Sequence, residues 1–175
     1  MRVAYADPPY PHQGIKYPER QEVDHGELIE RLEREFPDGW ALSTSASTLQ
    51  EVLALCPPSE YVGRKRKSGT GVRVGIWCKT NAMPTPSQRI TWSWEAVIYK
   101  GGRWQPNNSH IYVRDYLVAA TTSGFLGATI IGEKPREFCF WLFKLLGLQS
   151  GDEFVDLFPG SGSVTKWWSK WSCQP

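Results

Sequence analysis

Residues 3–10 read Val-Ala-Tyr-Ala-Asp-Pro-Pro-Tyr and join an apolar, strand-like run to two consecutive prolines. Proline has no amide hydrogen and fits neither a strand ladder nor a helix interior, so the strand must become a loop at Asp7. Ligands bind at the carboxyl ends of strands in open α/β sheets, so this turn brings an acid, two rigid carbonyls and the Tyr10 ring to a candidate site. Taken alone, the stretch leaves a merely proline-stiffened turn as the alternative.

The composition predicts a globular protein of one domain spanning residues 1–175, with 41% hydrophobic and 22% charged residues. A net charge of +2 does not by itself indicate a polyanionic partner. Nine Trp and seven Tyr predict either an aromatic core or surfaces that stack on planar groups. The four cysteines are far apart, which argues against a zinc cluster or a disulfide framework. Without a membrane-length apolar run or a signal peptide, we expect a cytoplasmic protein with no metal and no membrane partner.

Strand and helix patterns alternate in the first third of the chain. Asp24 followed by Glu27 predicts a helix cap, and apolar residues at helical spacing continue until Pro37. Residues 39–43 predict a short buried strand, and residues 49–55 predict a second amphipathic helix. This order favours parallel crossover units.

The middle of the chain, residues 63–123, follows another pattern and is interpreted as a variable recognition region. It opens with the basic, glycine-containing segment 63–71. Residues 72–78 and 92–99 predict two strands with no helix between them, which indicates an antiparallel pair at one edge of the sheet.

The last third returns to the α/β pattern, with a helix predicted at 138–146 and a buried strand at 153–158. The turn Pro-Gly-Ser-Gly-Ser at 159–163 then opens another helix. Glycines let a ligand approach the backbone, and helix N-terminal amides attract negative charge, so this turn suits a nucleotide-type ligand. A purely structural turn remains open, since the Walker ending and the full dinucleotide fingerprint are both absent.

Three motifs together, at residues 7–10, 133–135 and 156–163, resemble the S-adenosylmethionine-dependent amino-methyltransferases of DNA. Their order, with Asp-Pro-Pro-Tyr first and the glycine-containing cofactor motif last, resembles the circularly permuted subgroup. The resemblance implies a three-layer, Rossmann-like α/β fold with a mostly parallel sheet and an antiparallel edge. With an acid as its first residue, the catalytic motif resembles that of adenine-N6 enzymes rather than that of cytosine-N4 enzymes.

The same resemblance implies roles for individual residues. Asp7 and the Pro8 carbonyl would accept hydrogen bonds from the adenine amine, and Tyr10 would stack on a base that has left the duplex. The implied catalytic residues are Asp7, Pro8, Pro9 and Tyr10; those implied to bind S-adenosylmethionine are Lys134, Pro135, Asp156, Phe158, Gly160 and Gly162.

Only residues 164–175 follow the cofactor motif, whereas the family carries further strands there that bind the ribose and border the adenine. The expected sheet is therefore truncated at one edge, and a second subunit could complete the cofactor site. This departure leaves a non-catalytic nucleic-acid-binding protein of the same fold as the alternative. An enzyme acting on RNA, a free nucleotide or cytosine N4 also stays open.

DNA is the expected partner, and two parts of the middle region could contact it. The candidates for binding phosphates are Arg64, Lys65, Arg66, Lys67 and Arg73, and Arg103 is a further nucleic-acid-binding candidate at the start of the next loop. Residues 104–110 form a polar stretch capable of base contacts. Short charge runs are commonly solvated loops, which is the alternative for both. Trp167, Trp168 and Trp171 are interpreted as packing residues or as a dimer surface.

Overall fold

The computed structural model describes residues 1–12, 22–67, 70–84, 89–103, 112–122 and 132–173. The strands are β1 (Arg2–Ala6), β2 (Gly39–Ser45), β3 (Tyr61–Val62), β4 (Lys65–Arg66), β5 (Arg73–Lys79), β6 (Trp94–Gly101), β7 (Tyr116–Ala119) and β8 (Glu153–Asp156). The helices are α1 (His25–Glu35), α2 (Leu49–Leu55), α3 (Arg136–Leu145) and α4 (Ser163–Ser172). No described helix is long and apolar enough to cross a membrane.

Six strands form one sheet in the order β7-β5-β6-β2-β1-β8. β1 pairs in parallel with both β2 and β8, and β5 pairs in parallel with β7. β6 runs antiparallel to its two neighbours, β2 and β5. Among the described strands of this sheet β6 is therefore the one that is reversed, so the sheet is mostly parallel. β3 and β4 form a separate hairpin.

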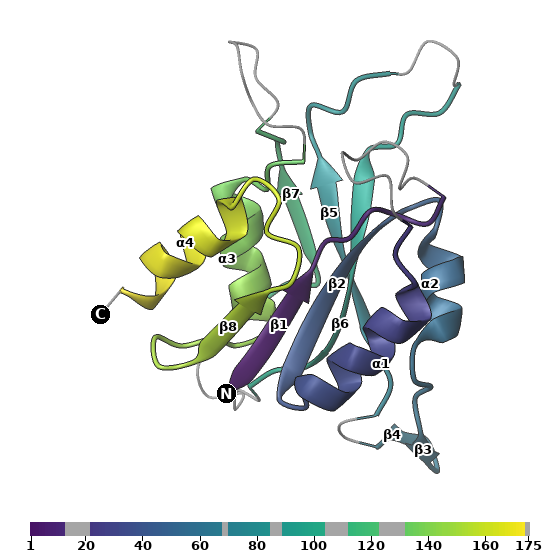
Figure 1. The fold of residues 1–175 in the computed structure, drawn as a ribbon. Helices are drawn as coiled ribbons and strands as arrows, with labels where there is room; N and C mark the ends of the chain where they lie inside the picture. Colours follow the sequence, from purple (N-terminus) through teal and green to yellow (C-terminus); the bar gives the residue numbers. More distant parts are fainter. Residues whose placement is uncertain (13–21, 68–69, 85–88, 104–111, 123–131, 174–175) are drawn as a thin grey trace.

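The sheet lies between two helix layers, with α1 and α2 on one face and α3 and α4 on the other (Figure 1). The alternation of β1 divides the core accordingly. Ala4 and Ala6 pack with α1 and α2, whereas Val3 and Tyr5 pack with α3 and α4. The predicted three-layer Rossmann-like architecture is confirmed.

The first helix forms as its sequence predicts. The Asp24 carboxylate accepts hydrogen bonds from the amides of Gly26 and Glu27, which caps the helix N-terminus. Its apolar stripe is buried against the sheet, and the helix ends ahead of Pro37, where a missing amide hydrogen prevents continuation.

The antiparallel pair was predicted correctly, but its position at the sheet edge was wrong. β6 pairs on both sides, and β7 adds a further strand beyond β5. β7 has only four residues, with Tyr116 and Val118 exposed, so its sequence carries little of the apolar signal of an internal strand. At the other side the described sheet ends at β8, which pairs with β1 alone.

The border of the sheet that is formed by the strand ends, as distinct from its outermost strands, brings together the residues of a candidate site. The parallel strands β1, β2, β5 and β8 finish there, and β6 begins there because it is reversed. Asp7, Lys79, Glu95 and Asp156 therefore lie at the same edge, which is where open α/β sheets bind ligands.

Candidate functional site

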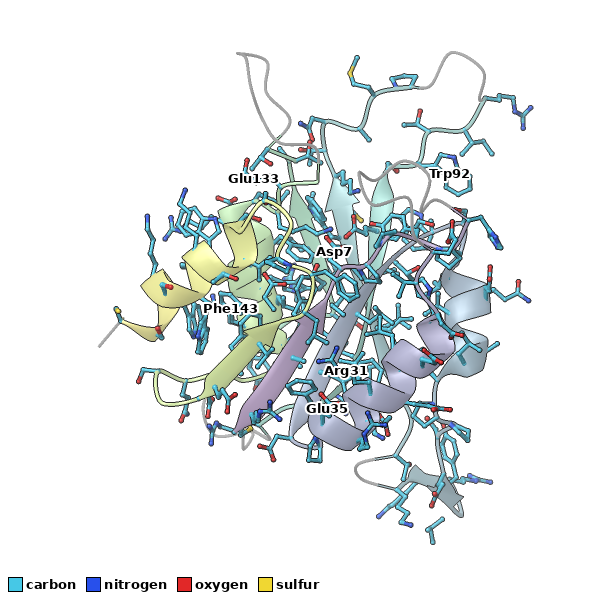
Figure 2. The ribbon with its side chains drawn as sticks, viewed as in Figure 1. Asp7, Arg31, Glu35, Trp92, Glu133 and Phe143 are labelled. Carbon is cyan, nitrogen blue, oxygen red and sulfur yellow. The ribbon has the colours of Figure 1, made fainter. Side chains whose placement is uncertain are left out.

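Asp7 lies at the centre of this edge, directly after β1 (Figure 2). Its side chain is 22% exposed, and its Oδ2 lies 3.1 Å from Nζ of Lys134. Pro8 behind it is buried, while Pro9 and Tyr10 are half-buried. The loop thus presents a mostly buried carboxylate beside a rigid backbone, as the sequence predicted.

Lys134 continues the contact into a chain of alternating charges. Its Nζ lies 2.5 Å from Oε1 of Glu95, and Oε2 of Glu95 lies 3.0 Å from Nζ of Lys79. The Lys134 and Glu95 side chains are 6% and 4% exposed. We call Asp7, Lys134, Glu95 and Lys79 the charge network; two acids and two bases make it formally neutral.

The surroundings shift the ionisation of the two acids in opposite directions. Burial raises the pKa of Asp7 to about 6, with Lys134 opposing the shift and Glu95 adding to it. Burial would also raise the pKa of Glu95, but the charges of Lys134 and Lys79 outweigh it and lower that pKa to about 2. Asp7 is accordingly the network's more basic carboxylate.

Aromatic rings enclose the ammonium groups of the network. Nζ of Lys134 lies 5.3 Å from the Phe138 ring centroid and 5.7 Å from that of Trp77. Nζ of Lys79 lies 4.9 Å from a Trp77 ring centroid. Rings at these distances attract cations and exclude water, which strengthens the charge interactions among the four residues.

The cofactor motif lies beside the network, after β8. Burial raises the pKa of Asp156, whose Oδ2 accepts a hydrogen bond from Thr165 at 3.1 Å. Its Oδ1 is buried and makes no hydrogen bond of standard geometry with the described residues, although the backbone of Phe158 donates toward the carboxyl and opposes the rise in its pKa. Such an orphaned acceptor is costly unless a ligand donates to it.

The glycines of this turn have left-handed backbones, with φ of 46° at Gly160 and 71° at Gly162. Gly162 is the N-cap of α4, and a β-carbon added there would meet no atom within 4 Å. The turn thus leaves open space ahead of the first amides of α4. Phe158, just before it, is half-buried.

Lys134 links the two motifs. Its amide donates a hydrogen bond of 3.1 Å to Oγ of Ser163, the buried first residue of α4, while its ammonium contacts Asp7. Pro135, next to it, is the N-cap of α3. Segments at both ends of the chain are therefore held together through one buried lysine.

Glu95, Lys79 and Ser163 were not among the predicted site residues. Glu95 carried a readable signal, because it is the only charged residue in the apolar run 94–99. A charge in a buried strand is expensive unless it is paired, so it commonly marks a site. Ser163 ends the glycine-containing motif at 156–163, but its contact with Lys134 depends on tertiary structure, and Lys79 had no comparable signal.

The predicted nucleic-acid-binding residues do not lie with Asp7. Arg64, Lys65, Arg66 and Lys67 belong to the β3–β4 hairpin, at the opposite end of the sheet (Figure 1). Arg103 follows the far end of β6. Its Nη2 donates hydrogen bonds to Oδ1 and Oδ2 of Asp152 at 2.7 Å and 3.0 Å. Residues 104–110 lie outside the described residues. Nucleic-acid binding by these residues stays a prediction.

The tryptophans of α4 pack, as one of the two interpretations expected. The Trp168 ring centroid lies 5.3 Å from that of Phe154, and Trp171 lies 5.1 Å from Phe140. All three tryptophans of the helix are half-buried against the α3–α4 core. Their role as a dimer surface stays a prediction.

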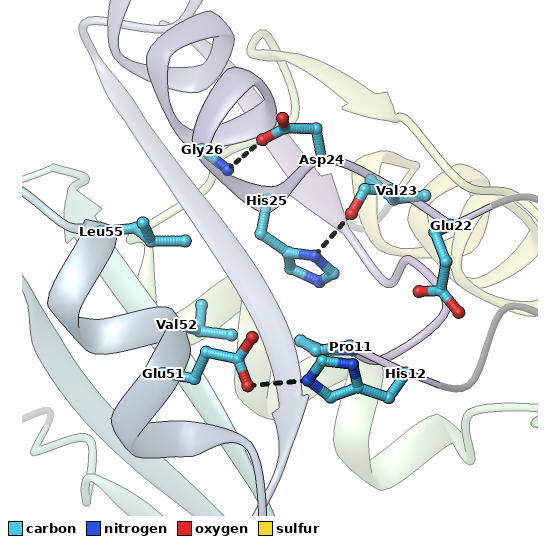
Figure 3. Close-up of a pocket in the computed structure, with 10 residues that line it drawn as sticks. All are labelled: Pro11, His12, Glu22, Val23, Asp24, His25, Gly26, Glu51, Val52 and Leu55. Atoms are coloured by element: carbon cyan, nitrogen blue, oxygen red, sulfur yellow. Dashed lines mark hydrogen bonds and ion pairs between the residues drawn. The ribbon is translucent and has the colours of Figure 1, made fainter.

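A pocket of about 410 Å³ lies beyond the Asp-Pro-Pro-Tyr loop, lined in part by Pro11 and by the start of α1 (Figure 3). His12 Nε2 lies 3.3 Å from Oε2 of Glu51, and the His25 ring bonds to the Val23 carbonyl. The lining of the pocket includes the acids Glu22, Asp24 and Glu51. Their charge makes this pocket unsuitable for phosphate.

No described group of three or more His, Cys, Asp or Glu residues could hold a metal ion.

Comparison with known proteins gives structural likeness only. No family model matches the chain, and no curated protein matches it. The crystal structure of the M1.HpyAVI–SAM complex is similar with a TM-score of 0.63 and 16% identity, covering 98% of this chain and 78% of that one. The crystal structure of M1.HpyAVI has a TM-score of 0.60 and 13% identity, covering 98% and 76%. The chain therefore shares the fold of these proteins.

Proposed function

We propose that this protein transfers a methyl group from S-adenosylmethionine to the exocyclic N6 of adenine in DNA. The observation that carries the proposal is the bridge made by Lys134, which joins the Asp7 loop to the glycine turn through its ammonium and its amide. A substrate site and a cofactor site would thereby be adjacent. M1.HpyAVI has the same fold and was solved in complex with SAM, which supports the choice of cofactor.

The turn after β8 fits S-adenosylmethionine. The orphaned Oδ1 of Asp156 could accept a hydrogen bond from the cofactor, and Gly160 and Gly162 leave the backbone approachable. Phe158 would give an apolar contact, and Lys134 and Pro135 would border the methionine end. When bound, the cofactor supplies an activated methyl group on a sulfonium.

Asp7 and Pro8 supply what the acceptor amine lacks. The lone pair of an adenine amine is delocalised into the ring, so the nitrogen is a poor nucleophile. Two acceptors, the Asp7 carboxylate and the Pro8 carbonyl, would bond its two hydrogens and turn its lone pair toward the methyl donor. Tyr10 would stack on the flipped base, while Pro9 fixes the loop.

Glu95 would act as a positioning residue in this scheme. Its contact with Lys134 is the shorter of the two that the ammonium makes, 2.5 Å against 3.1 Å to Asp7. Glu95 thereby takes up much of the lysine charge, which leaves the Asp7 carboxylate a more basic acceptor for the hydrogen of the amine. Lys79 balances the second Glu95 oxygen.

Calorimetric titration with S-adenosylmethionine and S-adenosylhomocysteine, paired with detection of N6-methyladenine in DNA, tests the proposal. Asp156→Ala should abolish cofactor binding, whereas Asp7→Ala should keep binding and lose transfer. Glu30→Ala, which removes an exposed carboxylate from α1, is the matched control and should change neither.

The same assay separates the alternatives. Methylation of RNA or of cytosine N4 in place of DNA adenine would redirect the substrate assignment. A folded protein that binds no cofactor at millimolar concentration would overturn the proposal for the chain alone and favour a non-catalytic nucleic-acid-binding role. A stoichiometry of half a cofactor per chain would indicate a site completed by a second subunit.

A further inference from the structure

A second hollow lies on the α3 layer, away from the charge network. It is a groove of about 420 Å³ between α3 and the strand β7 with the segment before it. We call it the α3–β7 groove. Its lining includes Tyr112, Arg114, Tyr116, Arg136, Phe140 and Lys144.

The charge of the groove suits a polyanion. Arg114, Arg136 and Lys144 are all exposed, and Glu137 is the one acid among the described residues that line the hollow. The acidic pocket of Figure 3 has the opposite character. Of these two hollows, the α3–β7 groove is therefore the one that electrostatics favours for phosphate groups.

Aromatic rings lie among these cations. Tyr112 is 81% exposed and Tyr116 is 44% exposed, although large apolar rings are usually covered. Nη1 of Arg114 donates to the Tyr116 hydroxyl at 2.7 Å, and its guanidinium lies 5.5 Å from that ring's centroid. Rings and cations interleaved along a groove are how proteins hold an unpaired nucleic-acid strand.

One end of the groove lies at the first residue of α3, close in sequence to the charge network. Arg136 opens α3 two residues after Lys134, whose ammonium contacts Asp7. From Arg136 to Lys144 the helix rises by roughly 12 Å, a length over which one strand of duplex DNA carries about three phosphates.

We infer that the α3–β7 groove binds the DNA strand that flanks the target adenine, with phosphates on Arg114, Arg136 and Lys144. Exposed bases next to the flipped adenine stack on Tyr112 and Tyr116. This inference rests on the proposed function for the identity of the strand, whereas the affinity of the groove for DNA is independent of catalysis.

The test compares two variants that each lose three positive charges. Arg114→Gln/Arg136→Gln/Lys144→Gln removes the three cations of the groove, and Arg64→Gln/Lys65→Gln/Lys67→Gln removes three of the four cations at residues 64–67 of the β3–β4 hairpin. Fluorescence anisotropy with labelled DNA is measured over a salt series. We expect the groove variant to bind about tenfold or more weakly, with a log K against log salt slope reduced by roughly 2–3, and the hairpin variant to stay near wild type.

Loss of affinity in the hairpin variant alone, equal loss in both, or no loss in either overturns the inference. Melting temperatures check that each variant folds, and the single changes Lys144→Gln and Tyr112→Leu, both at exposed side chains, repeat the test with less risk. Each should weaken DNA binding about two- to threefold or more, and unchanged affinity in both counts against the groove.

Cofactor titration of the same variants keeps the two proposals apart. A protein that binds DNA through the groove but neither binds S-adenosylmethionine nor methylates DNA refutes the proposed function and leaves the groove intact. A protein that methylates DNA equally well in the groove variant, at subsaturating DNA, refutes the groove and leaves the function intact.

Discussion

Nζ of Lys134 lies 2.5 Å from Oε1 of Glu95, so two residues 39 positions apart form a buried ion pair next to Asp7. Desolvating two such charges is expensive, and the pair repays the cost only while both partners remain. Removing either partner leaves an uncompensated charge in the core.

Replacing Glu95 with glutamine should therefore destabilise the fold and impair the site. The neutral amide keeps the shape of the side chain but leaves Lys134 to pair with Asp7 alone. We expect a loss of about 3–5 kcal/mol in the free energy of unfolding, measured by urea denaturation. Where the variant stays folded, kcat should fall roughly tenfold, about 1.4 kcal/mol, with the cofactor Kd unchanged.

Glu30→Gln, on the exposed face of α1, is the matched control and should leave both quantities at wild-type values. A Glu95→Gln protein with wild-type stability and turnover would show that the ion pair is dispensable and that Asp7 does not depend on it.

Methyl transfer should depend on pH through Asp7. Its pKa is raised to about 6, and the acceptor role needs the ionised carboxylate. The rate constant kcat/KM should therefore fall as pH drops through about 6, to roughly a tenth of its plateau at pH 5. Cofactor Kd, measured over the same range, reports whether the loss lies in substrate handling; a flat profile of kcat/KM between pH 5 and 8 would remove the carboxylate from the rate-determining chemistry.

Local patterns explain how far the sequence could go. The cap at Asp24, the prolines after Asp7 and the glycine turn at 160–162 each act through neighbouring residues, so their structure is readable without the fold. The order of the strand and helix patterns indicated parallel crossover units, whereas the three-layer, Rossmann-like architecture was implied by the resemblance to a family.

Long-range pairing explains what was missed. Glu95 reaches the site only because β6 runs in reverse and begins at the edge where the parallel strands end. The charges at 64–67 lie at the far end because their hairpin precedes the start of β5, a fact that no local pattern carries. The groove residues come from two segments, α3 and β7, that only the folded sheet brings together.

The free energy of unfolding should also depend on the ionisation of Asp7. Ionisation is expected to raise kcat/KM but to lower the stability of the fold. The pKa of Asp7 is about 6 in the folded protein and 3.8 ordinarily, so between these values the folded state binds the proton more tightly. Stability then falls as pH rises from about 4 to 6, by up to roughly 3 kcal/mol. Asp7→Asn lacks this ionisation, so it should be more stable than wild type at pH 8, with the difference shrinking toward pH 4.5.

Glu95 does not confuse that comparison, because its pKa of about 2 lies below the range and both proteins contain it. Its own contribution has the reverse sign: it is present above the ordinary value of 4.5 and is lost as pH falls toward 2. A gap between Asp7→Asn and wild type that does not change from pH 8 to 4.5 would mean that Asp7 ionises normally.

A substitution at Gly162 can show whether the turn contacts the cofactor, because the stability cost of the left-handed backbone can be measured separately from the effect on cofactor Kd. Gly162 has a φ of 71° and open space at its β-carbon position, and Gly63 in the β3–β4 hairpin has a φ of 60° with equally open space. Alanine at either position should cost about 1 kcal/mol of stability, because only the left-handed backbone is penalised. The cofactor would lie against the turn at Gly162 but not against the hairpin. Gly162→Ala should therefore raise the S-adenosylmethionine Kd about tenfold while Gly63→Ala leaves it unchanged, and equal Kd values in calorimetry would mean that the turn does not contact the cofactor.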